Sequence, residues 1–143
     1  MILYLDTSAW LKLYVAERGT EEVIAAVQSA ELVAISRIAY AEARAALARV
    51  LREKRTTHAE HRKRIAALDA DYVEVLKVEV TEEVVRQAGD LAESHALRGF
   101  DAIQLASARW LARKTRKSVG LLAFDKRLNE AARALGLRPP GGT

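Results

Sequence analysis

The sequence contains no cysteine, only two prolines and few aromatic residues. The absence of cysteine excludes disulfides, thiolate zinc sites and cysteine nucleophiles. Both prolines lie near the end of the chain, at Pro139 and Pro140, so no proline-rich linker divides the rest. No stretch approaches the roughly 20 apolar residues that a membrane span needs. The apolar start, residues 1–5, is too short for a signal peptide, so we expect a cytoplasmic protein without a membrane segment.

A chain of 143 residues can form one domain with a sizeable core and is too short for two domains of ordinary size. Half of the residues are hydrophobic and 29% are charged, a balance that excludes a disordered chain. We expect a single domain over residues 1–138. A short flexible tail is expected over residues 139–143, where two glycines follow the two prolines.

The net charge of +4 is mild, but the basic residues are concentrated in two segments. Residues 44–64 hold eight basic and two acidic side chains, which gives 8 − 2 = +6. Residues 109–117 hold five basic side chains and no acidic one. Such clusters are typical of proteins that bind the phosphate backbone of a nucleic acid. The alternative is a set of solvated helix faces, and composition alone favours it.

Short apolar runs alternate with helical segments along the chain. We predict strands over residues 2–5, 32–35, 72–78 and 119–123. Helices are predicted over residues 8–15, 20–28, 36–53, 81–95 and 126–135, with Thr20, Ser36 and Thr81 as caps. A further helix is predicted between residue 53 and Leu68, and another begins at Asp101. This alternation predicts an α/β fold, a parallel sheet with helices on both faces. Ligands bind such sheets beyond the carboxyl ends of the strands, where the strand order reverses.

Four acidic residues are candidates for a site at that edge. Asp6 directly follows the first predicted strand and Asp125 the fourth, while Glu42 and Asp101 lie among small and apolar residues near helix starts. Asp6, Asp101 and Asp125 taken singly are each most simply a helix N-cap. If all four carboxylates converged, they would repel one another unless a divalent cation neutralised them. Carboxylates without cysteine or histidine suit Mg²⁺ or Mn²⁺ rather than zinc.

Four segments of the chain resemble the PIN-domain ribonucleases, above all the VapC toxins of bacterial and archaeal toxin–antitoxin pairs. The segments are M-I-L-Y-L-D-T-S-A-W-L-K-L-Y, S-R-I-A-Y-A-E-A-R-A-A-L, L-R-G-F-D-A-I-Q-L-A-S-A and L-L-A-F-D-K-R-L-N-E-A-A-R-A-L-G-L. They occur in the family's order and spacing between Ile2 and about Leu137. The resemblance implies a three-layer α/β/α fold and a Mg²⁺-dependent endoribonuclease, with Mn²⁺ as the alternative metal. It also implies a homodimer that is inhibited by a small VapB-like antitoxin.

The resemblance assigns roles to individual residues. Asp6, Glu42, Asp101 and Asp125 match the four catalytic acids. We expect Asp6 and Asp101 to hold the metal, and Glu42 and Asp125 to complete or tune the site. Thr7 and Ser8 match the hydroxyl positions beside the first acid. The family often has Ser or Thr two residues before the last acid, whereas this chain has Ala123, which makes Asp125 the most dispensable of the four. The chemistry is metal-assisted hydrolysis of RNA phosphodiester bonds.

Two other classes of acidic-pocket protein fit the sequence less well. A receiver domain has adjacent acids after its first strand, and a haloacid-dehalogenase-type phosphatase has a second aspartate two residues after the first. In this chain Thr7 and Ser8 occupy those positions. A catalytically silent PIN-fold module that binds RNA or protein is the alternative function. We expect His58 and His61 on a solvated helix face and Trp10 and Trp110 in the core or an interface.

Overall fold

The computed structural model describes residues 1–141, which form four strands and seven helices. In chain order these are β1 (Ile2–Leu5), α1 (Thr7–Leu11), α2 (Thr20–Ser29), β2 (Leu32–Ser36), α3 (Ala39–Arg52), α4 (His58–Glu74), β3 (Leu76–Val78), α5 (Glu82–His95), α6 (Gly99–Thr115), β4 (Val119–Leu122) and α7 (Lys126–Ala134). The strands form one sheet of order β3-β2-β1-β4, in which each neighbouring pair is parallel. The predicted α/β fold with a parallel sheet is confirmed.

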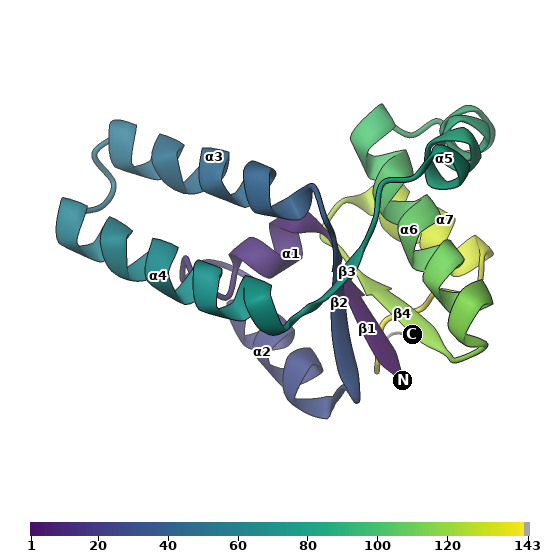
Figure 1. Ribbon diagram of the computed structural model, residues 1–143, viewed down its shortest axis with the longest axis horizontal. Helices are drawn as coiled ribbons and strands as arrows, with labels where there is room; N and C mark the ends of the chain where they lie inside the picture. Colours follow the sequence, from purple (N-terminus) through teal and green to yellow (C-terminus); the bar gives the residue numbers. More distant parts are fainter. Residues whose placement is uncertain (142–143) are drawn as a thin grey trace.

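The sheet lies between two layers of helices, as Figure 1 shows. Side chains of β1 alternate between them: Ile2 and Tyr4 pack with α5, α6 and α7, whereas Leu3 and Leu5 pack with α1 to α4. Because both faces of β1 are covered, all four of its residues are buried, which explains its continuous apolar run. Trp10 is buried in the second layer, as predicted.

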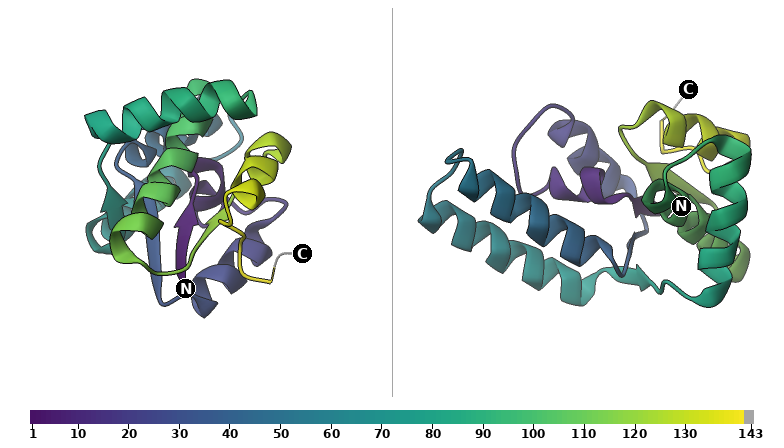
Figure 2. Two further views of the ribbon diagram at one scale, coloured as in Figure 1. Left: turned by 90° about the vertical axis from the view of Figure 1, so that its right-hand side faces the viewer. Right: turned by 90° about the horizontal axis from the view of Figure 1, so that it is seen from above.

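Helices α3 and α4 form a hairpin that extends beyond the sheet (Figures 1 and 2). The free end of the hairpin lies between the end of α3 at Arg52 and the start of α4 at His58. The basic segment, residues 44–64, occupies most of α3 and the first half of α4 around this free end. The net charge of +6 carried by residues 44–64 therefore lies around the free end of the hairpin, away from the sheet.

Three of the predicted N-caps are confirmed. The side chains of Asp6, Thr81 and Asp125 accept hydrogen bonds from backbone amides in the first turns of α1, α5 and α7. Two others are wrong. Ser36 is the last residue of β2, and α3 begins only at Ala39. Helix α6 begins at Gly99 with Arg98 at its N-cap, so Asp101 lies inside the first turn and does not cap the helix.

Thr20 is not the cap of α2 either, because it closes the preceding loop. Its hydroxyl donates to the carbonyl of Lys12 at 3.0 Å and accepts from the amide of Glu17 at 3.0 Å. The bond to Lys12 occupies a carbonyl that a longer α1 would need, and α1 ends at Leu11 instead of Val15. Gly19 takes the N-cap position with φ +98°, where a Cβ would meet the ring of Phe124 at 2.7 Å.

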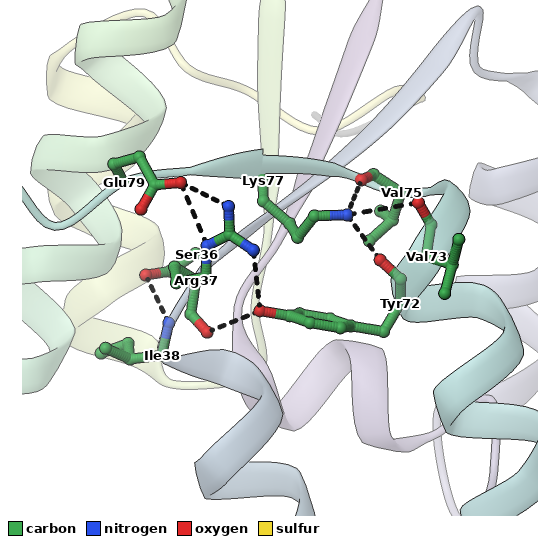
Figure 3. Close-up of polar contacts among 8 residues, drawn as sticks. All are labelled: Ser36, Arg37, Ile38, Tyr72, Val73, Val75, Lys77 and Glu79. Atoms are coloured by element: carbon green, nitrogen blue, oxygen red, sulfur yellow. Dashed lines mark hydrogen bonds and ion pairs between the residues drawn. The ribbon is translucent and has the colours of Figure 1, made fainter.

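The predicted strand over residues 72–78 is wrong for its first half, because α4 continues past Leu68 to Glu74. Lys77 of β3 turns back onto the end of this helix (Figure 3): its Nζ donates to the carbonyls of Tyr72 at 2.6 Å, Val75 at 2.9 Å and Val73 at 3.4 Å. A cation at a helix C-terminus satisfies carbonyls that have no amide partner. The ring of Tyr72 packs 4.7 Å from that of Tyr40 on α3, between ring centroids. These tertiary contacts override the β-rich local composition.

We predict that Lys77→Met lowers the free energy of unfolding by about 1–2 kcal/mol, because it leaves carbonyls at the end of α4 without a donor. Urea denaturation measures this loss. Lys63→Met, at an exposed position of the same helix, is the matched control and should change stability by less than about 0.5 kcal/mol. Equal effects of the two substitutions would show that the lysine does not stabilise the helix end.

The segment after α7 lies along the outer edge of β4. The amide of Leu121 donates to the carbonyl of Leu137 at 3.1 Å, and a Cβ on Gly120 would meet the carbonyl of Arg138 at 2.5 Å. Of the predicted tail, Gly142 and Thr143 lie outside the described residues, and the division into a domain and a flexible tail stays a prediction. Within residues 1–141, no helix is both long and apolar enough to cross a membrane.

Candidate active site

The four predicted acids line one cavity of about 530 Å³ at the carboxyl ends of β1 and β4. This is the point where the strand order reverses, since the chain moves from β1 outward to β2 and β3 and then returns to the other side of β1. Each acid comes from a different helix start: Asp6 and Asp125 cap α1 and α7, and Glu42 and Asp101 lie in the first turns of α3 and α6. Helix N-termini carry partial positive charge, which favours carboxylates there.

Asp6 is the most buried of the four, with 6% of its surface exposed. Its Oδ1 accepts hydrogen bonds from the amide of Ala9 at 2.8 Å and from the hydroxyl of Ser8 at 2.8 Å. Burial raises the pKa of Asp6 to about 6, and the negative charges of Asp101 and Glu42 add to the increase, while the two hydrogen bonds oppose it. Asp101 and Glu42 therefore lie close enough to Asp6 for their charges to disfavour its ionised form.

The other three acids each have a partner of their own. Oδ2 of Asp101 accepts from Nε of Arg98 at 3.2 Å, Oε1 of Glu42 accepts from the hydroxyl of Thr7 at 2.6 Å, and Oδ1 of Asp125 accepts from the amide of Leu128 at 2.9 Å. Within the described chain, no three acidic or histidine side chains are already gathered closely enough to ligate one ion. The structure thus brings the predicted residues to one cavity and leaves each carboxylate with a separate contact.

The residues fit a hard divalent cation. The cavity offers carboxylate and hydroxyl oxygens as ligands, with no sulfur and no imidazole among its lining residues. Burial is the main cause of the raised pKa of Asp6, and the charges of Asp101 and Glu42 add to it; a cation would compensate this negative charge.

Sequence reasoning missed several lining residues, above all Gln104. Gln104 is 3% exposed, and its Nε2 donates to Thr7 Oγ1 at 3.2 Å. Its position three residues after Asp101 places both side chains on one face of α6, a spacing that could have revealed it. Arg98, Phe100 and Phe124 also line the cavity.

Position 123 is an alanine without a side-chain hydroxyl, and the structure shows how the backbone before Asp125 is held. Ala123 is 5% exposed and packs in the core beside α7. Its carbonyl accepts a hydrogen bond from Nδ2 of Asn129 at 3.0 Å, which fixes the backbone just before Asp125.

Residues 3–134 match the PIN domain, and the chain belongs to this family, whose ribonucleases are generally metal-dependent. Ribonuclease VapC45 of Mycobacterium tuberculosis is 36% identical over 143 residues, which covers 96% of this chain and 93% of that protein. Within the PIN family, the chain is therefore a member of the VapC ribonucleases.

Two solved structures share the fold. The crystal structure of Mycobacterium tuberculosis VapC20, a Sarcin-Ricin loop cleaving toxin, has a TM-score of 0.66 at 22% identity and covers 96% of this chain and 99% of that chain. A toxin–antitoxin complex from Klebsiella pneumoniae has a TM-score of 0.56 at 21% identity and covers 86% of each chain.

Without added metal, we predict that the buried carboxylate of Asp6 makes the protein less stable as pH rises from 4 to 7. The unfolded chain loses the Asp6 proton near its ordinary pKa of 3.8, whereas the folded chain keeps it to about pH 6. In that window the folded state binds more protons, so rising pH disfavours it. Asp6→Asn retains a capping side chain and removes the charge.

The measurement is the free energy of unfolding of wild type and Asp6→Asn in excess chelator at several pH values. We expect the wild type to lose about 2–3 kcal/mol relative to the variant between pH 4 and pH 7. A wild type that gains stability relative to the variant over this range would contradict the raised pKa.

Proposed function

We propose that this VapC-family ribonuclease cleaves RNA internally, by metal-dependent phosphodiester hydrolysis at the acidic cavity, as the toxin of a toxin–antitoxin pair. The observation that carries the proposal is the meeting of four carboxylates, from four different helix starts, in one cavity at the switch point of the sheet. A PIN-fold module that only bound RNA or protein would have no need for four carboxylates in one cavity, one of them buried.

Asp6 and Asp101 would hold the metal ion, Mg²⁺ or Mn²⁺, with Glu42 and Asp125 completing or tuning the site. Such an ion, when bound, activates a water for in-line attack on phosphorus and stabilises charge on the phosphate oxygens. The Ala9 amide and the Ser8 hydroxyl orient Asp6 for this role. The Arg98 side chain, 83% exposed beside Asp101, offers a guanidinium to the RNA phosphate.

RNA binding is supported by the continuity between the cavity and the basic hairpin. Helix α3 starts at the cavity, where Glu42 lies, and ends at Arg52, about 15 Å further along the helix axis. The positive charge of residues 44–64 therefore lies within reach of an RNA strand whose phosphate occupies the cavity. Hydrolysis by water needs no 2′-hydroxyl, so a preference for RNA must come from binding. We propose that the protein acts in the cytoplasm, where the RNA of the cell is found.

We predict unequal losses when the acids are changed to asparagine. Asp6→Asn and Asp101→Asn should abolish single-turnover cleavage of RNA at saturating Mg²⁺, because each removes a direct ligand. Asp125→Asn should slow cleavage by about tenfold, since asparagine still caps α7 and position 123 has no hydroxyl to orient the carboxylate.

Asp90→Asn, at an exposed position on α5, is the matched control and should cleave at the wild-type rate. Excess chelator should stop cleavage by the wild type. Full activity of Asp6→Asn and Asp101→Asn in chelator would refute the metal assignment, and loss of all activity in Asp125→Asn would show that Asp125 holds the metal or water directly.

The partners that we propose are a second copy of the chain and a VapB-like antitoxin. An apolar cavity of about 740 Å³ lies beside the acidic cavity, between α5 and the start of α6. Four residues line both cavities: Glu42, Arg98, Phe100 and Asp101. Phe100 and Val85 at this cavity are 63% and 44% exposed, which is unusual for large apolar side chains. An antitoxin segment with apolar side chains would cover them and block the acids.

We predict that Val85→Glu weakens binding of the proposed VapB-like antitoxin by at least about tenfold, because it places a charge in the apolar cavity. Val73→Glu, at a position on α4 that is 74% exposed, is the control and should leave binding unchanged. Titration calorimetry gives the affinities and light scattering the stoichiometry. A wild type that stays monomeric at micromolar concentration and does not bind a VapB-like antitoxin would contradict both proposed partners.

A further inference from the structure

A chain of three hydrogen bonds connects the interior of the sheet with the acidic cavity. Tyr4 donates from its hydroxyl to Oε1 of Gln104 at 2.6 Å, Nε2 of Gln104 donates to Oγ1 of Thr7 at 3.2 Å, and Thr7 donates to Oε1 of Glu42 at 2.6 Å. The four residues come from β1, α6, α1 and α3. The series of hydrogen bonds therefore crosses from the layer of α6 to the layer of α3 at the end of the central strand.

The direction of each hydrogen bond in this series is fixed by the group that accepts the next one. An ionised Glu42 can only accept, so Thr7 must give it the hydroxyl proton. The oxygen of Thr7 then accepts from Gln104, which requires the amide nitrogen to face Thr7 and the amide oxygen to face Tyr4. Tyr4 is 0% exposed, and its hydroxyl donates to this amide oxygen.

We propose that Tyr4 and Gln104 are positioning residues that fix the orientation of the Thr7 hydroxyl and, through it, hold the Glu42 carboxylate in the acidic cavity. The proposal rests on the proposed ribonuclease function, in which Glu42 completes the metal site. Tyr4 and Gln104 act at a distance: neither hydroxyl nor amide contacts a carboxylate directly, and Tyr4 does not line the cavity.

The arrangement has one weak point, the rotation of the Gln104 amide. If Tyr4 loses its hydroxyl, the amide oxygen of Gln104 has no donor in a buried position. A half-turn of the amide then brings this oxygen to Thr7, where it competes with Glu42 for the one hydroxyl proton. Tyr4→Phe removes a single oxygen atom and leaves the ring in place, so it releases Glu42 while preserving the core.

The kinetic test compares single-turnover cleavage of RNA at saturating Mg²⁺. Tyr4→Phe and Gln104→Met should each slow cleavage by about tenfold without changing the RNA concentration that gives half the maximal rate. Tyr14→Phe is the matched control, because it removes a tyrosine hydrogen bond of equal length, 2.6 Å to Asp71, that lies outside the cavity. This variant should cleave at the wild-type rate. Thr7→Ser should retain activity that Thr7→Val loses.

A double-mutant cycle separates positioning from general damage to the fold. Tyr4→Phe combined with Thr7→Val should be no slower than Thr7→Val alone, because both changes break the same series of hydrogen bonds. The rate loss caused by Tyr4→Phe should instead multiply with the loss caused by Asp125→Asn. A double variant of Tyr4→Phe and Thr7→Val that shows the product of the two losses would overturn the proposal, as would a wild-type rate for Tyr4→Phe.

The second readout needs neither RNA nor metal. In the metal-free protein, the side-chain amide protons of Gln104, followed by NMR, should exchange slowly with solvent in the wild type and in Tyr14→Phe, and faster in Tyr4→Phe and Thr7→Val. Unchanged exchange in both variants would refute the chain of hydrogen bonds. A wild type that shows the protected amide and yet cleaves no RNA would instead refute the ribonuclease function.

Discussion

Asp6 brings a negative charge to a position that is 6% exposed, at the carboxyl end of the central strand. Removing a carboxylate from water costs free energy, and the fold offsets part of that cost with the Ala9 amide, the Ser8 hydroxyl and the start of α1. Asp101 and Glu42 act in the opposite direction, because their charges raise the pKa of Asp6 further. The folded chain therefore holds a repulsion that a core of apolar residues would not contain. Stability given up at one cavity is typical of a site whose charge serves a ligand and not the fold.

The parallel sheet explains why this repulsion is concentrated at one edge. When a helix follows each parallel strand, the helix begins at the edge where the strand ends. Helices α1, α3 and α7 follow β1, β2 and β4 in this way, and the turn between α5 and α6 places the start of α6 at the same edge. Four helix starts bring four sets of free amides and four positive dipole ends to the cavity. The same topology that produces the three layers thus supplies the field in which the carboxylates can be ionised. Fold and site are for this reason difficult to alter independently.

Local patterns predicted those parts of the molecule whose cause is local. The apolar runs of β1 and β4, and the aspartates that follow them, need only a buried strand and a helix cap, and both appear as predicted. The end of α4 needed information from elsewhere, since Lys77 stabilises it from the next strand. Gln104 was missed because α6 is apolar on most of its surface, and its partners Tyr4 and Thr7 are about 100 residues away in the sequence. That Glu42 and Asp101 share a cavity with Asp6 followed from the family resemblance, because no spacing within the chain encodes it.

The four carboxylates differ in how firmly their hydrogen-bond partners hold them in place. Asp6 and Asp125 are bound to backbone amides of their own helices, and Glu42 is held through Thr7. Asp101 is paired only with Arg98, whose side chain is 83% exposed, and an ion pair in that environment contributes at most about 1 kcal/mol. Asp101 is consequently the most weakly held of the four carboxylates, and its partner Arg98 lines the same cavity. Under the proposed function, this exposed ion pair places a positive group beside the acids, at the position where an RNA phosphate would bind.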